Sequence, residues 1–172
     1  KEALELNKSF IHKNINGSSY GVLKWAMSID GRVGLPSGRS KWISNELSRS
    51  YVHSLRANFD AIVIGGNTLR KDDPLLTTRG LKSPEPLRVV VTNSLNLPKK
   101  RKLWDCESAP TLVIYNSSVA NENKLKDLPS CVEVEKLSSS NPKELSILLA
   151  KRGCNNVLWE CGPKLATAAI QQ

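Results

Sequence analysis

Short apolar runs separated by polar or turn-forming residues recur along most of the chain. They predict strands at residues 20–27, 61–64, 87–92, 111–115 and 157–160, with a weaker signal at 132–134. The runs at 61–64, 87–92 and 111–115 are continuous and rich in β-branched residues, which is typical of strands buried on both faces. We therefore expect a central sheet with both faces covered.

One amphipathic helix is expected before the run at 61–64. It begins with Ser44 as N-cap and ends near Asn58, and its apolar residues recur at spacings of three and four. These residues are Leu47, Tyr51, Val52 and Leu55. Their spacing gives the helix one apolar face.

Helix signals are strongest after residue 140. Asn141, Pro142 and Glu144 provide an N-cap, a proline at the first helical position and a glutamate at the third, and Gly153 closes the segment. A further helix is expected over residues 165–170, after the last strand. Strands that alternate with helices predict parallel βαβ units. The expected fold class is therefore α/β, with a mostly parallel central sheet and helices on both faces.

Length and composition fit one domain. The chain has 172 residues, of which 40% are hydrophobic, and this is enough for one core. Residues 1–19 are polar and sparsely apolar, and we expect a linker or a surface helix that belongs to a preceding domain. The domain itself should occupy residues 20–172. Both ends have the pattern of a longer chain, because the first residue is Lys1 and residues 166–172 form a helical pattern without a terminator.

Charge narrows the choice of partner. The chain has 25 Lys and Arg against 16 Asp and Glu, and the net charge of +9 suits an anionic partner. The basic residues are scattered, and the run at 99–102 is interpreted as a solvated loop rather than a nucleic-acid patch. No apolar stretch reaches the roughly 20 residues of a membrane span, and residues 1–21 lack the apolar core of a secretory signal. We expect a phosphorylated small molecule as partner, and neither nucleic acid nor a membrane.

The cysteines show no metal-binding pattern. The four are Cys106, Cys131, Cys154 and Cys161, without any Cys-x-x-Cys spacing. His12 and His53 are far from all of them in sequence, so we expect no metal site. We interpret all four cysteines as free thiols in a reducing compartment.

Candidate site residues follow the predicted strands, because ligands of parallel sheets bind at the carboxyl ends of the strands. These segments are residues 28–32, 65–68, 92–94 and 160–163. At a strand-to-helix junction such as Gly162 and Pro163, free backbone N–H groups and the helix dipole favour a pyrophosphate. The same turn is common as a purely structural feature, and the six-residue glycine fingerprint of dinucleotide sites is absent. The residues alone leave both interpretations open.

Charged residues near these segments also have two interpretations. Glu160 directly ends an apolar strand, where its carboxylate would be desolvated unless a ligand donor or Lys24 pairs with it. Lys24 lies inside a predicted strand, and a solvent-facing lysine is the alternative. Arg56 ends a predicted helix, whose C-terminus it would complement. Asp72 and Asp73 precede a proline and would open a turn.

The segments at residues 24–32, 40–44, 56–62, 65–77, 87–91 and 159–165 together resemble the reductase domain of the bifunctional riboflavin-biosynthesis deaminase/reductase. The match runs in order from about residue 4 to residue 169, which is more specific than any single motif. The resemblance implies a dihydrofolate-reductase-like fold, NADPH as hydride donor, a homodimer and an upstream deaminase-like domain. Family members continue through further strands, so we expect C-terminal strands to be missing here. The implied location is the plastid stroma in a plant, which we favour, or the cytoplasm in a bacterium.

The resemblance also implies where each ligand lies. It places the cofactor near Ala26, Trp42, Thr68, Asp72, Asn93, Gly162, Pro163, Lys164, Leu165, Ala166, Thr167 and Ala168. It places the substrate near Lys24, Ser40, Arg56, Leu76, Arg79 and Glu160. Arg56 and Arg79 suit a substrate phosphate through charge-assisted hydrogen bonds, and Ser40 can add a hydroxyl bond.

The implied reaction reduces the ribose of a phosphorylated aminouracil to a ribityl chain. A hydride must reach C1′ of the sugar, in its ring-opened imine form, and a proton must reach the nitrogen or the departing ring oxygen. Lys24 and Glu160 are the candidates for orienting and protonating that centre.

Three positions depart from the family pattern. Cys161 stands where a small residue is common, Lys164 replaces a small hydroxyl residue, and Thr92 with Asn93 replaces Asp-Ser. We expect Lys164 to strengthen phosphate binding and the other changes to alter cofactor affinity.

Two other functions stay open. One is the related reductase that acts before deamination, on the diaminopyrimidinone form of the intermediate. The other is a non-catalytic reductase-like module that serves a fused partner. Nucleic-acid binding ranks third, because the positive charge is dispersed.

Overall fold

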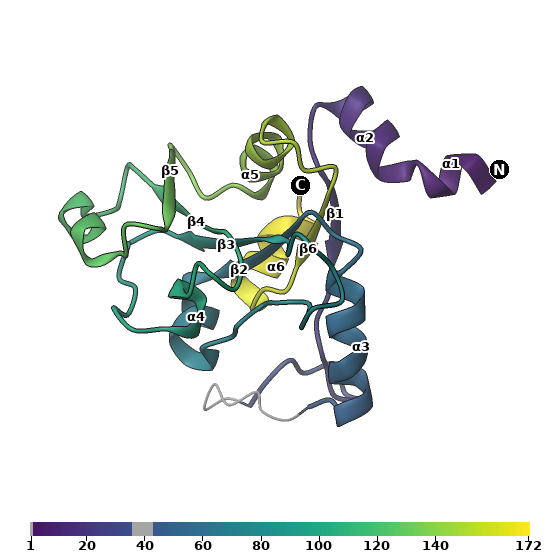
Figure 1. Ribbon diagram of the computed structural model, residues 1–172, viewed down its shortest axis with the longest axis horizontal. Coiled ribbons are helices and arrows are strands. Elements are labelled where there is room, and N and C mark those ends of the chain that lie inside the picture. The colour runs from purple at the N-terminus through teal and green to yellow at the C-terminus, as the bar shows by residue number, and fades with distance from the viewer. Residues whose placement is uncertain (1, 36–42) are drawn as a thin grey trace.

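Six parallel strands form the central sheet in the computed structural model, which describes residues 2–35 and 43–172 (Figure 1). The strands are β1 (Tyr20–Leu23), β2 (Ala61–Gly65), β3 (Leu87–Thr92), β4 (Thr111–Asn116), β5 (Glu133–Leu137) and β6 (Asn156–Trp159). Their order in the sheet is β1-β6-β2-β3-β4-β5, and every neighbouring pair is parallel. The chain therefore has the α/β class that its pattern predicts.

Six α-helices and two 3-10 helices accompany the strands within the described ranges. The α-helices are α1 (Glu2–Leu6), α2 (Lys8–Asn16), α3 (Glu46–Arg56), α4 (Gly66–Asp72), α5 (Pro142–Lys151) and α6 (Pro163–Ile170). The 3-10 helices are η1 (Lys102–Trp104) and η2 (Glu122–Asp127). Helices α5 and α6 pack against one face of the sheet, and α4 packs against the other.

The core has two layers, because side chains of the strands alternate between the faces of the sheet. In β2, Ile62 and Ile64 belong to one buried cluster, which also takes in Leu69 of α4. Ala61 and Val63 belong to the other cluster, with Leu145 and Leu149 of α5. Complete burial of each such aliphatic side chain contributes roughly 1.5–3 kcal/mol. Both faces of the sheet are covered, as predicted.

The strand predictions for β2 and β3 are confirmed, but the first strand is shorter than predicted. It ends at Leu23 instead of continuing to residue 27. The Lys24 N–H still donates to the Trp159 carbonyl at 3.0 Å, but β6, which lies beside β1 in the sheet, itself ends at Trp159. The edge strand β1 therefore ends where β6 ends, and Lys24 follows the strand rather than lying within it.

The helix predictions differ in accuracy. Helix α5 is confirmed: the Asn141 side chain accepts a hydrogen bond from the Lys143 N–H at 2.8 Å, and Gly153 adopts φ of +96°. The N-cap of α3 is Asn45, which accepts from the Ser48 N–H, so the prediction of Ser44 was wrong.

The predicted apolar face of α3 is only partly used. Leu47 and Tyr51 are 80% and 66% exposed, whereas Leu55 packs against the core. The helix therefore rests on the sheet through its last turns, and its first turns extend beyond the sheet.

Helix α4 is a feature that periodicity did not reveal. It has seven residues, which is too short for a pattern of two helical turns. Gly66 begins it, and a Cβ at Gly66 would lie 3.3 Å from the Thr92 side chain and 3.2 Å from Leu97. A glycine here lets the helix start pack closely against the end of β3.

Residues 2–16 form the two short helices α1 and α2, neither of which has a buried residue. The His12 ring lies edge-on to Tyr20 at 5.5 Å, and this contact connects α2 to β1. The assignment of this stretch to a preceding domain stays a prediction. None of the helices in the described residues has the length and apolar character that crossing a membrane requires.

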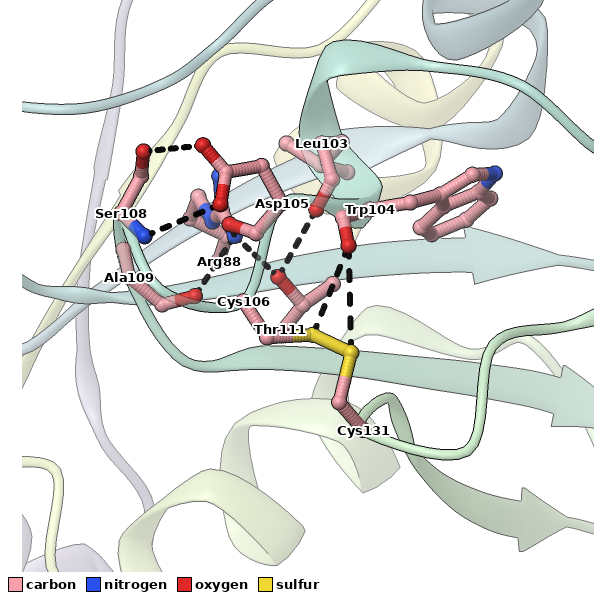
Figure 2. The surroundings of a disulfide bond; sticks show 9 residues. All are labelled: Arg88, Leu103, Trp104, Asp105, Cys106, Ser108, Ala109, Thr111 and Cys131. Carbon is pink, nitrogen blue, oxygen red and sulfur yellow. Dashed lines mark hydrogen bonds between the residues drawn. A yellow bond between two sulfur atoms is a disulfide. The ribbon is translucent and has the colours of Figure 1, made fainter.

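Cys106 and Cys131 form a disulfide, so the interpretation of all four cysteines as free thiols was wrong for this pair (Figure 2). Cys154 and Cys161 are free and buried. The paired residues are 25 positions apart and lie in two loops that flank β4, with their Cα atoms 6.2 Å apart. Such a pairing depends on the tertiary fold, and no cysteine spacing signals it.

Candidate active site

Two adjoining pockets lie at the carboxyl ends of the strands. The main pocket, of about 620 Å³, includes Lys24, Arg56, Leu76, Glu160 and Thr167 in its wall. The second pocket, of about 500 Å³, includes Gly66, Arg70, Asn93, Lys164 and Ala168. Four residues line both pockets: Asn67, Thr68, Gly162 and Pro163. The expected location of the site at this edge of the sheet thus coincides with both pockets.

An arginine–glutamate pair stands at the wall of the main pocket. Arg56 ends α3, and Glu160 directly follows β6. The Arg56 Nε donates to Glu160 Oε1 at 2.5 Å, and its Nη2 donates to Oε2 at 3.1 Å. Both side chains are only 10% exposed. This two-bond geometry is the strong form of a carboxylate–guanidinium contact, since each oxygen receives its own charge-assisted bond.

Lys24 brings a second positive charge to the same carboxylate. Its Nζ lies 3.9 Å from Glu160 Oε2, and its side chain is 31% exposed. The lysine is held at this place because β1 pairs with β6, so both chains leave the sheet side by side. Lys24 and Glu160, the two predicted catalytic residues, are therefore close together.

Arg56, rather than Lys24 or a ligand, is the principal partner of Glu160. The sequence interpretation named only the latter two as partners, and it gave Arg56 to the helix terminus or to a phosphate. Arg56 also donates from Nη1 to the Thr77 carbonyl at 3.1 Å. Most of its hydrogen-bonding capacity is thus used inside the protein.

His53 is a neighbour of this pair that the sequence interpretation missed. Its Nδ1 lies 3.2 Å from Arg56 Nη1 and 3.4 Å from the Thr77 carbonyl oxygen. With the ring proton on Nε2, Nδ1 accepts from Arg56; with the proton on Nδ1, it donates to the Thr77 carbonyl. Partial burial, followed by the charges of Arg56 and Arg79, lowers the pKa of His53 below its ordinary value of 6.5. The available signal was the spacing of three residues between His53 and Arg56 on one helix.

The loop after α4 holds several residues in the left-handed backbone region. Asp73, Leu76 and Arg79 have φ of 44°, 59° and 57°. For a residue such as leucine this conformation is unfavourable and persists only when the surroundings enforce it. Leu76 is buried and lines the main pocket, as its predicted contact with substrate requires. Arg79 is exposed and is not among the described residues that line the pocket.

The residues predicted to bind cofactor divide between the two pockets. Helix α6 begins with Gly162 as N-cap and Pro163 in its first turn. The main pocket is lined by Ala26, Asp72, Ala166 and Thr167, and the second pocket is lined by Asn93, Lys164, Leu165 and Ala168. Thr68 lines both. Ser40 and Trp42 lie outside the described residues.

The wall of the second pocket carries positive charge. Arg70 and Lys164 are the only charged residues among those described in its wall, which contains no carboxylate. Arg70 is a pocket residue that the sequence interpretation missed; its Nη1 donates to the Asn96 carbonyl at 2.8 Å. Its position two residues after Thr68, on the helix that follows β2, was the available signal. This donor set suits an anionic group.

Cys161 lines the main pocket beside Glu160 but has little nucleophilic character. Burial raises the pKa of its thiol to about 11. Since the thiolate is the reactive form, Cys161 contributes shape rather than covalent chemistry.

The family described as "RibD C-terminal domain" matches residues 19–172. The chain is 39% identical over 170 residues to the riboflavin biosynthesis protein PYRR, chloroplastic, of Arabidopsis thaliana, covering 99% of this chain and 28% of the relative. It is 40% identical over 167 residues to the riboflavin biosynthesis protein RibD of Synechocystis, covering 96% of this chain and 45% of the relative. The chain thus spans less than half the length of these relatives.

A solved structure shares the whole fold. It is a diaminohydroxyphosphoribosylaminopyrimidine deaminase/5-amino-6-(5-phosphoribosylamino)uracil reductase from Thermotoga maritima, with a TM-score of 0.84 and 29% sequence identity. The match covers 99% of this chain and 46% of that chain. The dihydrofolate-reductase-like fold that the resemblance implied agrees with this likeness.

Proposed function

The chain belongs to the RibD C-terminal domain family, and we propose that it uses NADPH to reduce the ribosyl group of 5-amino-6-(5-phosphoribosylamino)uracil to the ribityl form in riboflavin biosynthesis. The observation that carries this proposal is the cluster of Lys24, Arg56 and Glu160 at the wall of the main pocket, beside the turn at Gly162. The name of the Thermotoga maritima protein supports the substrate, because it includes this uracil reductase activity.

The pockets fit an elongated dinucleotide. They meet at Thr68 and Gly162, so one long ligand can occupy both. At the meeting point the N-terminus of α6 presents backbone N–H groups, which favour a pyrophosphate. Arg70 and Lys164 in the wall of the second pocket favour the additional phosphate of NADPH over the bare hydroxyl of NADH. When bound, the nicotinamide supplies the hydride.

Lys24 is the proton donor in this proposal. As an ionised carboxylate Glu160 has only acceptor oxygens, whereas the Lys24 ammonium has three N–H donors. Glu160 holds the ammonium toward the main pocket, and Arg56 fixes the orientation of Glu160. Lys24 donates to the nitrogen or ring oxygen of the substrate as C1′ is reduced.

The substrate phosphate is assigned to Arg79 together with the free donor capacity of Arg56. Arg79 lies close enough to His53 for its charge to lower the pKa of that histidine. His53 contacts Arg56, so the positive charges of Arg56 and Arg79 both lie near this histidine, at the edge of the main pocket. A phosphate there would be held by charge-assisted bonds.

Steady-state oxidation of NADPH tests the proposal. With the deaminated ribosylamino substrate we expect NADPH consumption that depends on both reactants and a ribityl product that mass spectrometry identifies. The related diaminopyrimidinone substrate should be turned over more slowly. Preference for that substrate would reassign the reaction to the step before deamination.

A binding measurement separates the non-catalytic alternative. NADPH added to the chain should quench tryptophan fluorescence, since Trp25 lines the main pocket. Absence of quenching at millimolar NADPH would favour a module without turnover.

We also propose a homodimer, an upstream deaminase-like domain and a location in the plastid stroma. The combined name of the Thermotoga maritima protein, of which this chain covers 46%, supports the upstream domain. The chloroplastic PYRR relative supports the plastid, and the cytoplasm is the alternative because a bacterial RibD is equally similar. Light scattering of the purified protein and fractionation of the source cells test these points.

A further inference from the structure

The disulfide lies where a reductant can reach it. Cys131 is exposed and Cys106 is half-buried, in contrast with the buried free cysteines Cys154 and Cys161. Thiol–disulfide exchange requires access to a sulfur atom, and exposed disulfides are the labile and regulatory ones. The two cysteines that a reductant can reach are thus the two that form the disulfide.

A hydrogen-bond acceptor for the reduced form of the pair is already in place. The Trp104 carbonyl oxygen lies 3.6 Å from the sulfur of Cys106 and 3.8 Å from that of Cys131 (Figure 2). Sulfur in a disulfide has no hydrogen to donate, whereas a thiol has one. Reduction therefore creates two S–H donors that already face an acceptor, and neither thiol needs to be buried without a partner.

The loop that contains Cys106 is connected to the wall of the main pocket. Figure 2 shows the buried Arg88 side chain next to the disulfide. Its Nη2 donates to the carbonyls of Asp105 and Ala109, and its Nη1 donates to the Leu75 carbonyl at 3.2 Å. Leu75 directly precedes Leu76, which lines the main pocket.

A second connection runs through the start of the same loop. The Lys102 N–H donates to Asp73 Oδ1 at 3.0 Å. Arg101 donates to the carbonyls of Leu69 and Arg70 in α4. Asp73 lies between Asp72 and Pro74, both of which line the main pocket. The segment 101–109 thus supports the pocket wall at two places, and the disulfide ties that segment to the turn before β5.

We propose that Cys106 and Cys131 are a redox modification site, a dithiol–disulfide couple that exchanges with a dithiol reductant and sets the rigidity of the main pocket wall. A thiolate of the reductant attacks the sulfur of exposed Cys131, and the sulfur–sulfur bond breaks with the electron pair on Cys106. The second thiol of the reductant then displaces Cys131. The reductant ends as a disulfide, two electrons pass to the protein, and both cysteines take up a proton.

Oxidation should favour activity. The disulfide limits the movement of segment 101–109 and thereby holds Asp73 and Leu76 in their left-handed conformations. After reduction we expect kcat/KM for the proposed substrate to fall by about fivefold, the lower end of typical coupling between sites. This kinetic part rests on the proposed function, whereas thiol counts and hydrogen exchange need no substrate.

The test compares the chain after oxidation with trans-4,5-dihydroxy-1,2-dithiane and after reduction with dithiothreitol. Mass-tagging of the denatured protein should find two thiols in the oxidised form, Cys154 and Cys161, and four in the reduced form. Hydrogen exchange of residues 73–76 and 101–109 should be faster in the reduced form and should slow again after reoxidation.

Two variants separate the couple from general effects of the reductant. Cys131→Ser should exchange like the reduced wild-type chain under both conditions. Cys154→Ala, which removes a thiol outside the pair, should respond to dithiothreitol as the wild type does.

The inference is overturned if the oxidised protein already shows four thiols, or if hydrogen exchange is the same at two and four thiols. A redox response in exchange without any NADPH oxidation would instead contradict the proposed function and leave the couple in place.

Discussion

Two buried arginines show how differently this fold uses the same side chain. Arg88 of β3 is completely buried and donates to three carbonyls, of Leu75, Asp105 and Ala109, and to the Thr111 hydroxyl at 2.6–3.2 Å. Burial lowers the pKa of Arg88. Arg56 is 9% exposed, binds a carboxylate through two bonds and lines the main pocket.

The difference lies in the partners. Arg88 has only neutral acceptors, and its Nε has no partner among the described residues, so its hydrogen bonds serve to hold loops together. Arg56 and Lys24 face one carboxylate at the edge of a hollow, which is an arrangement that a charged ligand can engage. We infer that Arg56, with Glu160 and Lys24, serves the chemistry of the site and is therefore less completely buried. Arg88, with the carbonyls that it binds, serves the stability of the fold.

The largest effect should come from Glu160→Gln. The amide keeps the shape but cannot orient the Lys24 ammonium by charge, so kcat should fall by about a thousandfold, within the range of general acid catalysis. Steady-state NADPH oxidation measures it. Glu133→Gln, which changes a surface carboxylate paired with Arg152, is the matched control. Unchanged turnover in Glu160→Gln would remove Glu160 from the reaction.

Arg88→Met should produce the opposite pattern. Three carbonyls and a hydroxyl lose a donor in a dry interior, and the free energy of unfolding should fall by about 3 kcal/mol. Urea denaturation measures this change, and activity per folded molecule should fall by no more than about tenfold. Arg152→Met, which breaks the two surface ion pairs with Glu133 and Glu135, should lower the free energy of unfolding by less than about 1 kcal/mol. An Arg88→Met protein that is stable but inactive would contradict the assignment of Arg88 to stability.

Lys164→Ala tests whether the second pocket binds the additional phosphate of NADPH. Loss of this charge should weaken NADPH binding by about tenfold with little effect on NADH, because only NADPH has the extra phosphate. Fluorescence titration with both cofactors measures the ratio. Lys151→Ala, on the exposed end of α5, is the control. An equal loss of affinity for NADPH and NADH would show that Lys164 does not bind the additional phosphate.

The smallest effect should be a loss of folding stability at acidic pH. Because the pKa of His53 is lowered in the folded chain, the unfolded chain takes up a proton first as pH falls below 6.5. Stability that is complete above pH 6.5 should thus decrease until pH reaches the lower, folded pKa. In urea unfolding at pH 7.5 and 5.5, His53→Gln should show a smaller decrease than the wild type or His12→Gln. An equal decrease in His53→Gln would show that other groups cause it.

Local patterns were sufficient for much of the fold. The strands β2 and β3 follow from short apolar runs rich in β-branched residues, at 62–64 and 89–91. Such runs are too short for a helix and are typical of strands buried on both faces. Helix α5 follows from Asn141 and Pro142, whose capping roles depend on adjacent residues alone. The end of β1 could not be predicted in this way, because it depends on where the neighbouring strand β6 ends, at Trp159.

The site was predictable in location but not in pairing. The rule that ligands meet parallel strands at their carboxyl ends placed Glu160 and Gly162 at the site, and the family resemblance added Lys24. The contact between Arg56 and Glu160 joins residues 104 positions apart, and the disulfide joins two loops across β4. Sequence spacing contains no signal for either, since both depend on how the helices and loops pack on the sheet.

Hydride tracing tests the central claim most directly. The chain is incubated with NADPH deuterated at the reactive nicotinamide carbon and with the deaminated ribosylamino substrate, and the product is analysed by mass spectrometry and NMR. The account predicts one deuterium at C1′ of a ribityl product. An unlabelled product, or deuterium at any other carbon, would contradict it.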